Sequence, residues 1–348
     1  MNKEFGSDFN FLTDEEFLLK DSSKSLFKSS EIALFFSGRV ALYQLLQQGI
    51  NTDKWEKVFV PSYYCHEVVD YLKDLPIEII YYKFNPISCG SDYALDIEDK
   101  KGNVIINVIY FGLVKLDLNG YNETIVIDDL THNFSAFFKS TADYCFGSLR
   151  KEFPIPVGGF CSSPKKNHLP LCENTSFAER VSAKKLSSMF LKNMYLKGQP
   201  IEKSTYRNLF AEAEREFENK LTNAALPESA KGVLVFLDIL KISLVKKQNM
   251  NVACKELFHT KEFFNNKHSS EEAFGLIFLC HSQEQKEKFR HYLISNLIFP
   301  ATLWPNQIRD EDIAIENQLV FVPVDFRYNE LDIKYIANKI KLFFQDEL

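Results

Sequence analysis

Six short, largely apolar runs between residues 58 and 162 constrain the fold of this chain more than any other feature. Runs of this length and composition are typical of buried strands. They cover residues 58–61, 77–83, 103–110, 124–129, 143–146 and 159–162. Helical patterns follow Arg39 and Glu67, so strands and helices alternate. This alternation predicts the α/β class, with a mostly parallel sheet sandwiched between helices.

The rest of the 348-residue chain predicts an arm and a second domain. Residues 1–30 show little periodicity, and we expect them to form an N-terminal arm that wraps a neighbouring subunit or the protein's own surface. The large domain is expected to cover residues 31–228, because a long apolar helix after Pro227 leads into a different pattern. Strand and helix patterns in residues 229–348 predict a smaller α+β C-terminal domain. The length supports two domains, since it exceeds that of most single ones.

Composition argues against several classes of partner. The net charge of −6 gives no broad cationic field, so nucleic acid is not expected to bind. No apolar run approaches membrane-spanning length, and the N-terminus lacks the apolar core of a signal peptide. The seven cysteines have no repeated spacing, which is typical of reduced thiols. We therefore expect a cytoplasmic protein without membrane insertion.

Two ionisable residues lie where a ligand site is expected. The strand pattern 124–129 ends in Asp129, and open α/β sheets bind ligands at the carboxyl ends of their strands. Lys151 follows on a loop, three residues after Ser148. This order suits pyridoxal phosphate, whose aldehyde bonds a lysine and whose pyridine nitrogen needs a buried carboxylate. Ordinary interpretations stay open, since Lys151 could be a surface charge and Asp129 a helix cap.

A phosphate site is predicted upstream of these residues. Ser37, Gly38 and Arg39 precede a helical pattern, and the free amides at a helix N-terminus bind phosphate well. Ser37 could also be an ordinary N-cap, which would use the same amides. Cys65 and His66 are adjacent, but no second pair follows at ligand spacing, so we predict no metal site.

These segments resemble the DegT-type sugar aminotransferases, a group of fold type I pyridoxal-phosphate enzymes. The resemblance covers residues 31–160 well and extends more thinly to the C-terminus. It is carried by the motifs at 37–42, 60–62, 110–112 and 128–129, and by a lysine loop before Gly158 and Gly159. The Ser-x-Arg-Lys form of that loop is similar to a subgroup seen beside bacterial polysaccharide genes. The resemblance implies a large fold type I domain with a seven-stranded sheet.

The resemblance also implies roles for individual residues. Lys151 would bond the cofactor aldehyde, and Asp129 would hold the pyridine nitrogen. Gly38, Arg39 and Ser148 would grip the phosphate. His132 stands where the family usually has a glutamine near the phenolic oxygen of the cofactor, and an imidazole can donate the same hydrogen bond.

Two further positions depart from the family pattern. The ring that stacks on the pyridine is replaced by Cys65, flanked by Tyr64 and His66, and any of these three could cover the cofactor. Val157 replaces the glutamate that usually precedes the paired glycines, which puts ordinary substrate handling in doubt. His132 could equally be a structural histidine.

By this resemblance the chain is expected to be a homodimeric aminotransferase. It would use pyridoxal 5'-phosphate to move an amino group from glutamate to a nucleotide-linked keto sugar in bacterial surface polysaccharide biosynthesis. Two alternatives stay open. One is another pyridoxal-phosphate reaction on the same scaffold, such as sugar dehydration or an amino acid lyase step. The other is a non-catalytic homologue that acts as a binding module.

Overall fold

A computed structural model of the chain describes residues 3–88, 93–267 and 272–346. Its centre is a seven-stranded sheet in the order β1-β7-β6-β5-β4-β2-β3. All neighbouring pairs are parallel except those that β7 makes with β1 and β6. The strands are β1 Ile32–Phe35, β2 Lys57–Pro61, β3 Glu78–Tyr82, β4 Asn103–Val108, β5 Ile125–Asp129, β6 Tyr144–Ser148 and β7 Gly159–Ser162. The predicted α/β class with a mostly parallel sheet is therefore confirmed.

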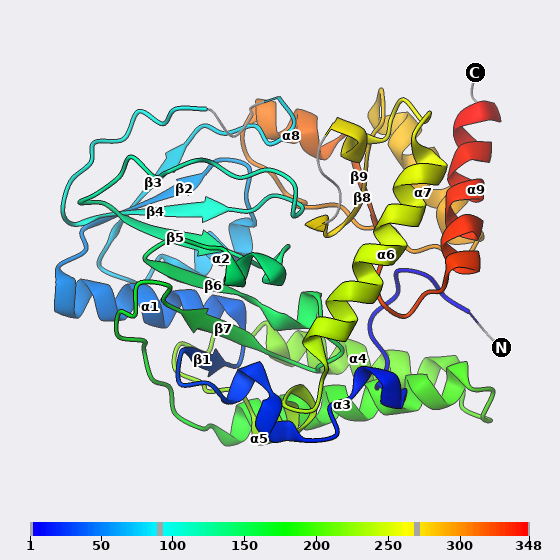
Figure 1. The fold of residues 1–348 in the computed structure, drawn as a ribbon, viewed down its shortest axis with the longest axis horizontal. Coiled ribbons are helices and arrows are strands. Elements are labelled where there is room, and N and C mark those ends of the chain that lie inside the picture. Colours follow the sequence, from blue (N-terminus) through cyan, green and yellow to red (C-terminus); the bar gives the residue numbers. More distant parts are fainter. Residues whose placement is uncertain (1–2, 89–92, 268–271, 347–348) are drawn as a thin grey trace.

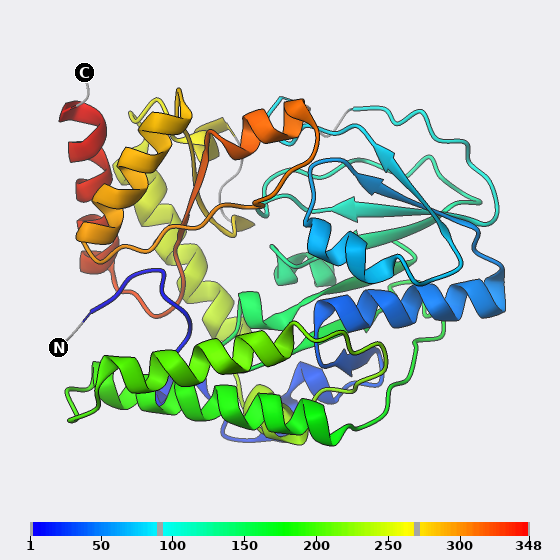
Figure 2. The ribbon, with the colours of Figure 1, turned by 180° about the vertical axis from the view of Figure 1, so that it is seen from behind.

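Helices cover the sheet and extend away from it (Figure 1). Helix α1 contacts β6 and β7, and its N-cap Ser37 accepts a hydrogen bond from the Val40 amide at 3.2 Å. Helices α3 and α4 lie side by side below the sheet in both views (Figure 2). The bounds are α1 Gly38–Asp53, α2 His66–Leu72, α3 Ser176–Leu196, α4 Lys203–Phe217, α5 Glu228–Leu234 and α6 Ile239–Leu257. None of the described helices is long and apolar enough to cross a membrane.

A second, smaller sheet lies beyond α6 (Figure 1). Strands β8 Gly275–Leu279 and β9 Leu319–Pro323 pair antiparallel, and α7 Gln283–Ser295, α8 Asp310–Glu316 and α9 Glu330–Asp346 complete this part. Many of its buried side chains form a second hydrophobic cluster, in which α6 and α9 pack together, whereas others, such as Ile277 and Phe321, belong to the main core. A domain boundary at residue 228 stays a prediction.

Two details differ from the sequence prediction. Strand β1 was not predicted, because it is only four residues long and half of its side chains are partly exposed. The single apolar helix predicted after Pro227 is two helices, α5 and α6. The chain turns between them because the Asp238 side chain caps α6 by accepting from the Lys241 amide at 3.0 Å, while the Asp238 amide donates to Phe17.

The N-terminal segment lies against the protein's own chain. Phe5 exchanges backbone hydrogen bonds with the strand-like segment after α7, and the Phe11 amide donates to Met189 of α3. Leu18 pairs with Leu237 in the turn between α5 and α6. The arm thereby contacts both the helices below the large sheet and the segment after α7 near the small sheet. It also brings Asp8 to the edge of a cavity.

Candidate active site

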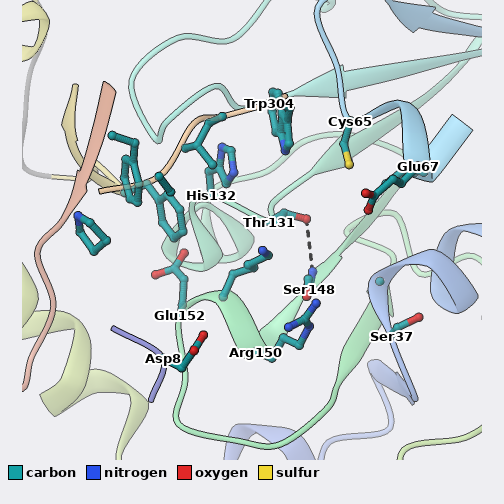
Figure 3. A pocket seen from close by; sticks show the side chains of 18 of the residues that line it. Asp8, Ser37, Cys65, Glu67, Thr131, His132, Ser148, Arg150, Glu152 and Trp304 are labelled. Carbon is teal, nitrogen blue, oxygen red and sulfur yellow. Dashed lines mark hydrogen bonds between the residues drawn. The ribbon is translucent and has the colours of Figure 1, made fainter. Parts of the chain in front are cut away.

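A cavity of about 670 Å³ lies at the carboxyl ends of β5 and β6 (Figure 3). Its wall is assembled from the arm, the start of α1, the loop before α2, the turn after β6, helices α3, α4 and α6, and the segments around β9. Every residue predicted to contact a cofactor lines this cavity: Ser37, Gly38, Arg39, Cys65, His66, Asp129, His132, Ser148 and Lys151.

Asp129 ends β5 and is buried. Tyr64 donates its hydroxyl hydrogen to Oδ2 at 2.5 Å, and the Thr131 amide donates to Oδ1 at 2.9 Å. Burial raises the pKa of the Asp129 carboxyl, because the ionised form loses hydration in apolar surroundings. A cation placed beside this carboxylate would reverse that effect, as the protonated pyridine nitrogen of a cofactor would.

Lys151 ends a short 3₁₀ turn, Leu149–Lys151, directly after β6. Its side chain retains accessible surface yet lies in the cavity wall, where surrounding protein lowers the pKa of the ammonium, first through burial and then through Arg150. Among the described residues, no side chain forms a recorded ion pair or hydrogen bond with the ammonium. An unpaired lysine with a lowered pKa is suited to nucleophilic attack on a carbonyl.

The start of α1 forms a backbone cradle. A Cβ on Gly38 would lie 3.1 Å from the Ser148 amide nitrogen, and a Cβ on Gly159 would overlap the backbone of Ser37. The Ser148 amide donates to the Thr131 hydroxyl at 3.2 Å (Figure 3). Side-chain-free backbone at a helix N-terminus is what a phosphate group requires.

The Arg39 guanidinium is engaged by other side chains near the start of α1. Its guanidinium pairs with Glu218 at 2.6 Å and lies over the rings of Tyr71 and Phe217, 5.6 and 5.2 Å from their centroids. Arg150 also lies over the Phe217 ring, 4.5 Å from its centroid. A direct grip of Arg39 on phosphate therefore stays a prediction, and it would require release from Glu218.

The three candidates for covering the ring lie in one loop. Tyr64 is buried and held by Asp129, and its ring meets Trp304 edge-on at 5.6 Å. Cys65 precedes α2 and lines the cavity, and burial raises the pKa of its thiol (Figure 3). Neither ring nitrogen of His66 has a hydrogen-bond partner among the described residues.

His132 is the centre of an aromatic stack (Figure 3). Its ring lies parallel to Phe274 on one side, at 4.6 Å, and to Trp304 on the other, at 4.8 Å. It is buried, and burial lowers the pKa of the imidazole to about 3, so the ring is neutral at pH 7. Its Nδ1 has no hydrogen-bond partner among the described residues.

Several cavity residues could not be foreseen from the sequence. Glu152 follows the lysine and accepts from the Lys246 ammonium at 2.9 Å and the Phe134 amide at 2.8 Å. Trp304 belongs to the C-terminal part of the chain, where the resemblance is thin, and its position beside His132 depends on the fold. Asp8 comes from the arm, some 140 residues away in the sequence, and no local pattern marks it.

Comparisons with known proteins address the fold. No family model and no curated protein matches the sequence. Among solved structures, Spr1654 of Streptococcus pneumoniae, designated a sugar aminotransferase and solved in its pyridoxal-phosphate form, aligns over 100% of both chains with a TM-score of 0.61 and 12% identity. Helicobacter pylori PseC, an aminotransferase of pseudoaminic acid biosynthesis, covers 99% of this chain and 100% of its own, with a TM-score of 0.59 and 11% identity. This chain has the fold type I architecture.

A third structure agrees with the resemblance seen in the sequence. It is a DegT DnrJ EryC1 StrS aminotransferase from Brucella abortus, which aligns over 90% of this chain and 86% of its own with a TM-score of 0.55 and 12% identity. At such identities the likeness establishes the fold. The chemistry has to be argued from the cavity.

Proposed function

We propose that the protein is a pyridoxal-phosphate-dependent aminotransferase of the DegT type. It moves an amino group from glutamate to a nucleotide-linked keto sugar in bacterial surface polysaccharide biosynthesis. The observation that carries the proposal is the joint placement of Lys151 and Asp129 in one cavity at the carboxyl edge of a fold type I sheet. A buried carboxylate and an unpaired lysine are the two groups that this cofactor needs.

The residues present fit the cofactor. Asp129 offers a buried carboxylate, the Gly38 backbone cradle suits a phosphate, and Nδ1 of His132 is a buried polar atom that lacks a partner. When bound, pyridoxal phosphate supplies an aldehyde that exchanges amines and a ring that accepts electrons. We assign Ser37, Gly38, Arg39 and Ser148 to its phosphate.

The chain's own residues would supply proton transfer, a charge opposite the pyridine nitrogen and a hydrogen bond. Lys151 would hold the cofactor, and its amine would move a proton as general base and then acid. Asp129 would keep the pyridine nitrogen protonated, while Tyr64 and the Thr131 amide fix the orientation of its carboxylate. His132, neutral and stacked with two rings, would donate a hydrogen bond to the phenolic oxygen.

The site's location also bears on assembly. Fold type I sites are built at subunit contacts, so we propose a homodimer, and we place it in the cytoplasm because of its composition. Both statements rest on the resemblance and the sequence.

Turnover tests the proposal. Purified protein is incubated with pyridoxal phosphate, glutamate and a panel of nucleotide-linked keto sugars, and formation of 2-oxoglutarate and an amino sugar is followed. We expect both products with wild type and neither with Lys151→Ala. Product analysis separates the dehydratase and lyase alternatives. Protein that stays colourless with added cofactor would instead indicate the non-catalytic binding module.

A further inference from the structure

A second, smaller pocket adjoins the candidate active site. It has a volume of about 260 Å³ and lies between the arm, α3 and α4. Asp8, Phe9, Met189 and Phe210 line both this side pocket and the main cavity. A ligand in the cavity could therefore extend into the side pocket across a shared wall. The mechanism proposed above assigns nothing to it.

The side pocket contains an unpartnered buried hydroxyl. Tyr206 of α4 is only 4% exposed, and its phenolic oxygen has no hydrogen-bond partner among the described residues. Its ring lines the pocket together with apolar side chains such as Met189 and Ala211. A buried hydroxyl without a partner destabilises a fold, so its presence calls for an explanation. The oxygen itself has almost no accessible surface, so the hydroxyl would reach a ligand in the pocket after a small movement of the tyrosine, and a hydrogen bond formed in this way would provide that explanation.

The arm presents a carboxylate to the same space. Arg327 donates to the backbone oxygens of Ser7 at 2.9 Å and Asp8 at 3.1 Å. Lys192, which is buried, donates to the Ser7 hydroxyl at 3.1 Å and to the Asp8 backbone oxygen. These contacts fix the main chain of Asp8 but leave its carboxylate without a recorded partner among the described residues. The carboxylate is exposed to the cavity (Figure 3).

The charges around the side pocket favour a neutral ligand. Lys192 and Arg207 are cationic, whereas Asp8 is anionic, and all three line the pocket. A ligand group of either charge would meet a like charge as well as an opposite one. Hydroxyl groups can donate to a carboxylate and also exchange hydrogen bonds with a phenol. The rings of Phe9 and Phe210 offer apolar surface for the carbon face of such a ligand.

We propose that the side pocket is a substrate subsite that takes a neutral, hydroxyl-bearing part of the sugar substrate, with Asp8 and Tyr206 as its polar contacts. The inference rests on the proposed function, because a sugar is the ligand class considered there. It adds the location at which this protein recognises the sugar's hydroxyl groups, and it assigns the N-terminal arm a part in specificity.

Tyr206→Phe gives the sharpest test, because stability and binding should change in opposite directions. Removing an unpartnered hydroxyl without changing the ring should raise the melting temperature of the ligand-free protein. The same change should weaken binding of UDP-glucose or UDP-N-acetylglucosamine, measured by titration calorimetry on cofactor-loaded protein, by about tenfold, which is ~1.4 kcal/mol. Tyr195→Phe is the matched control, since this tyrosine contacts Tyr206 but lies outside the pocket lining. It should leave the binding constant unchanged.

A second variant tests the arm. Asp8→Ala keeps the backbone oxygen that Arg327 and Lys192 hold, so the arm should stay in place while the affinity for the same nucleotide sugars falls by about tenfold. Asp14→Ala, an exposed carboxylate on the same arm without a recorded side-chain contact, should bind like wild type. Far-ultraviolet circular dichroism and melting temperature establish that both variants are folded.

The outcomes separate this inference from the proposed function. Conversion of glutamate to 2-oxoglutarate by cofactor-loaded protein does not involve the sugar, so its absence from wild type would contradict the aminotransferase proposal. Normal glutamate conversion with unaltered sugar binding in both Tyr206→Phe and Asp8→Ala would overturn the subsite alone. Failure of wild type to bind either nucleotide sugar would also overturn it. A lower melting temperature of Tyr206→Phe with unaltered binding would mean that a buried water satisfies the hydroxyl.

Discussion

His132 should make the stability of the protein depend on pH in a way that a glutamine at the same position would not. Burial between Phe274 and Trp304 lowers the pKa of this imidazole from an ordinary 6.5 to about 3. The folded state therefore keeps the ring neutral, whereas the unfolded chain binds a proton as the pH falls below 6.5. Stability contributed by the neutral ring is present above that pH and is lost progressively below it.

The size of the effect follows from the two pKa values. Between pH 7 and pH 5 the unfolded state gains most of one proton at this site and the folded state gains almost none. The free energy of unfolding changes by up to about 1.36 kcal/mol per pH unit, a slope that is reached when the unfolded imidazole is fully protonated. Because the imidazole is only partly protonated near pH 7, linkage lowers the free energy of unfolding by ~1.9 kcal/mol over the two pH units. The result hardly depends on the folded value, provided that it lies below about 4.

The assay compares urea unfolding of wild type and His132→Gln at pH 7 and pH 5. Glutamine is the residue that the family resemblance places here, and it cannot titrate. The variant should lose stability at both pH values because the ring stack is broken, but its loss between pH 7 and pH 5 should be smaller than that of wild type by about 2 kcal/mol. Parallel pH dependences would refute a neutral, buried His132 and the hydrogen-bonding role built on it.

Three further outcomes follow from contacts in the cavity. Asp129→Asn should still bind the cofactor covalently, but its rate of transamination should fall by about 10²-fold or more, because the negative charge opposite the cofactor ring is lost. Stopped-flow absorbance with glutamate measures this rate. Gly159→Ala should lower the free energy of urea unfolding by about 1–3 kcal/mol, because the new Cβ overlaps the Ser37 backbone. Glu214→Ala should lower the free energy of urea unfolding by about 3 kcal/mol, since the buried Lys185 would lose its paired carboxylate. An unchanged unfolding midpoint in Gly159→Ala or Glu214→Ala would contradict the argument for that variant.

The central sheet could be predicted because its strands are short, buried and separated by turn residues. The residues of β4, for instance, are buried along the whole strand, and four of the six are valine or isoleucine. Strand β1 escaped prediction because its pairing with β7 is fixed by contacts distant in sequence rather than by its own composition. The break between α5 and α6 was missed for a similar reason, since the turn before α6 is held by a hydrogen bond from the Asp238 amide to Phe17 in the arm.

The candidate site was predictable where chain order alone brings groups together. Asp129 and Ser148 end neighbouring parallel strands, so the topology places the carboxylate near the lysine turn. Asp8 and Tyr206 could not be found in this way, because the arm and α4 meet the cavity only through tertiary packing. The direction of Arg39 likewise depends on the tertiary contact that brings Glu218, at the C-cap of α4, to the start of α1.

Locating the covalent attachment of pyridoxal phosphate tests the account most directly. Wild-type protein and Lys151→Ala are loaded with the cofactor, reduced with borohydride, digested and analysed by mass spectrometry. We predict a single pyridoxyl adduct, on the wild-type peptide that contains Lys151, and none in the variant. The same reduced adduct in both proteins, on any other lysine, would contradict the assignment.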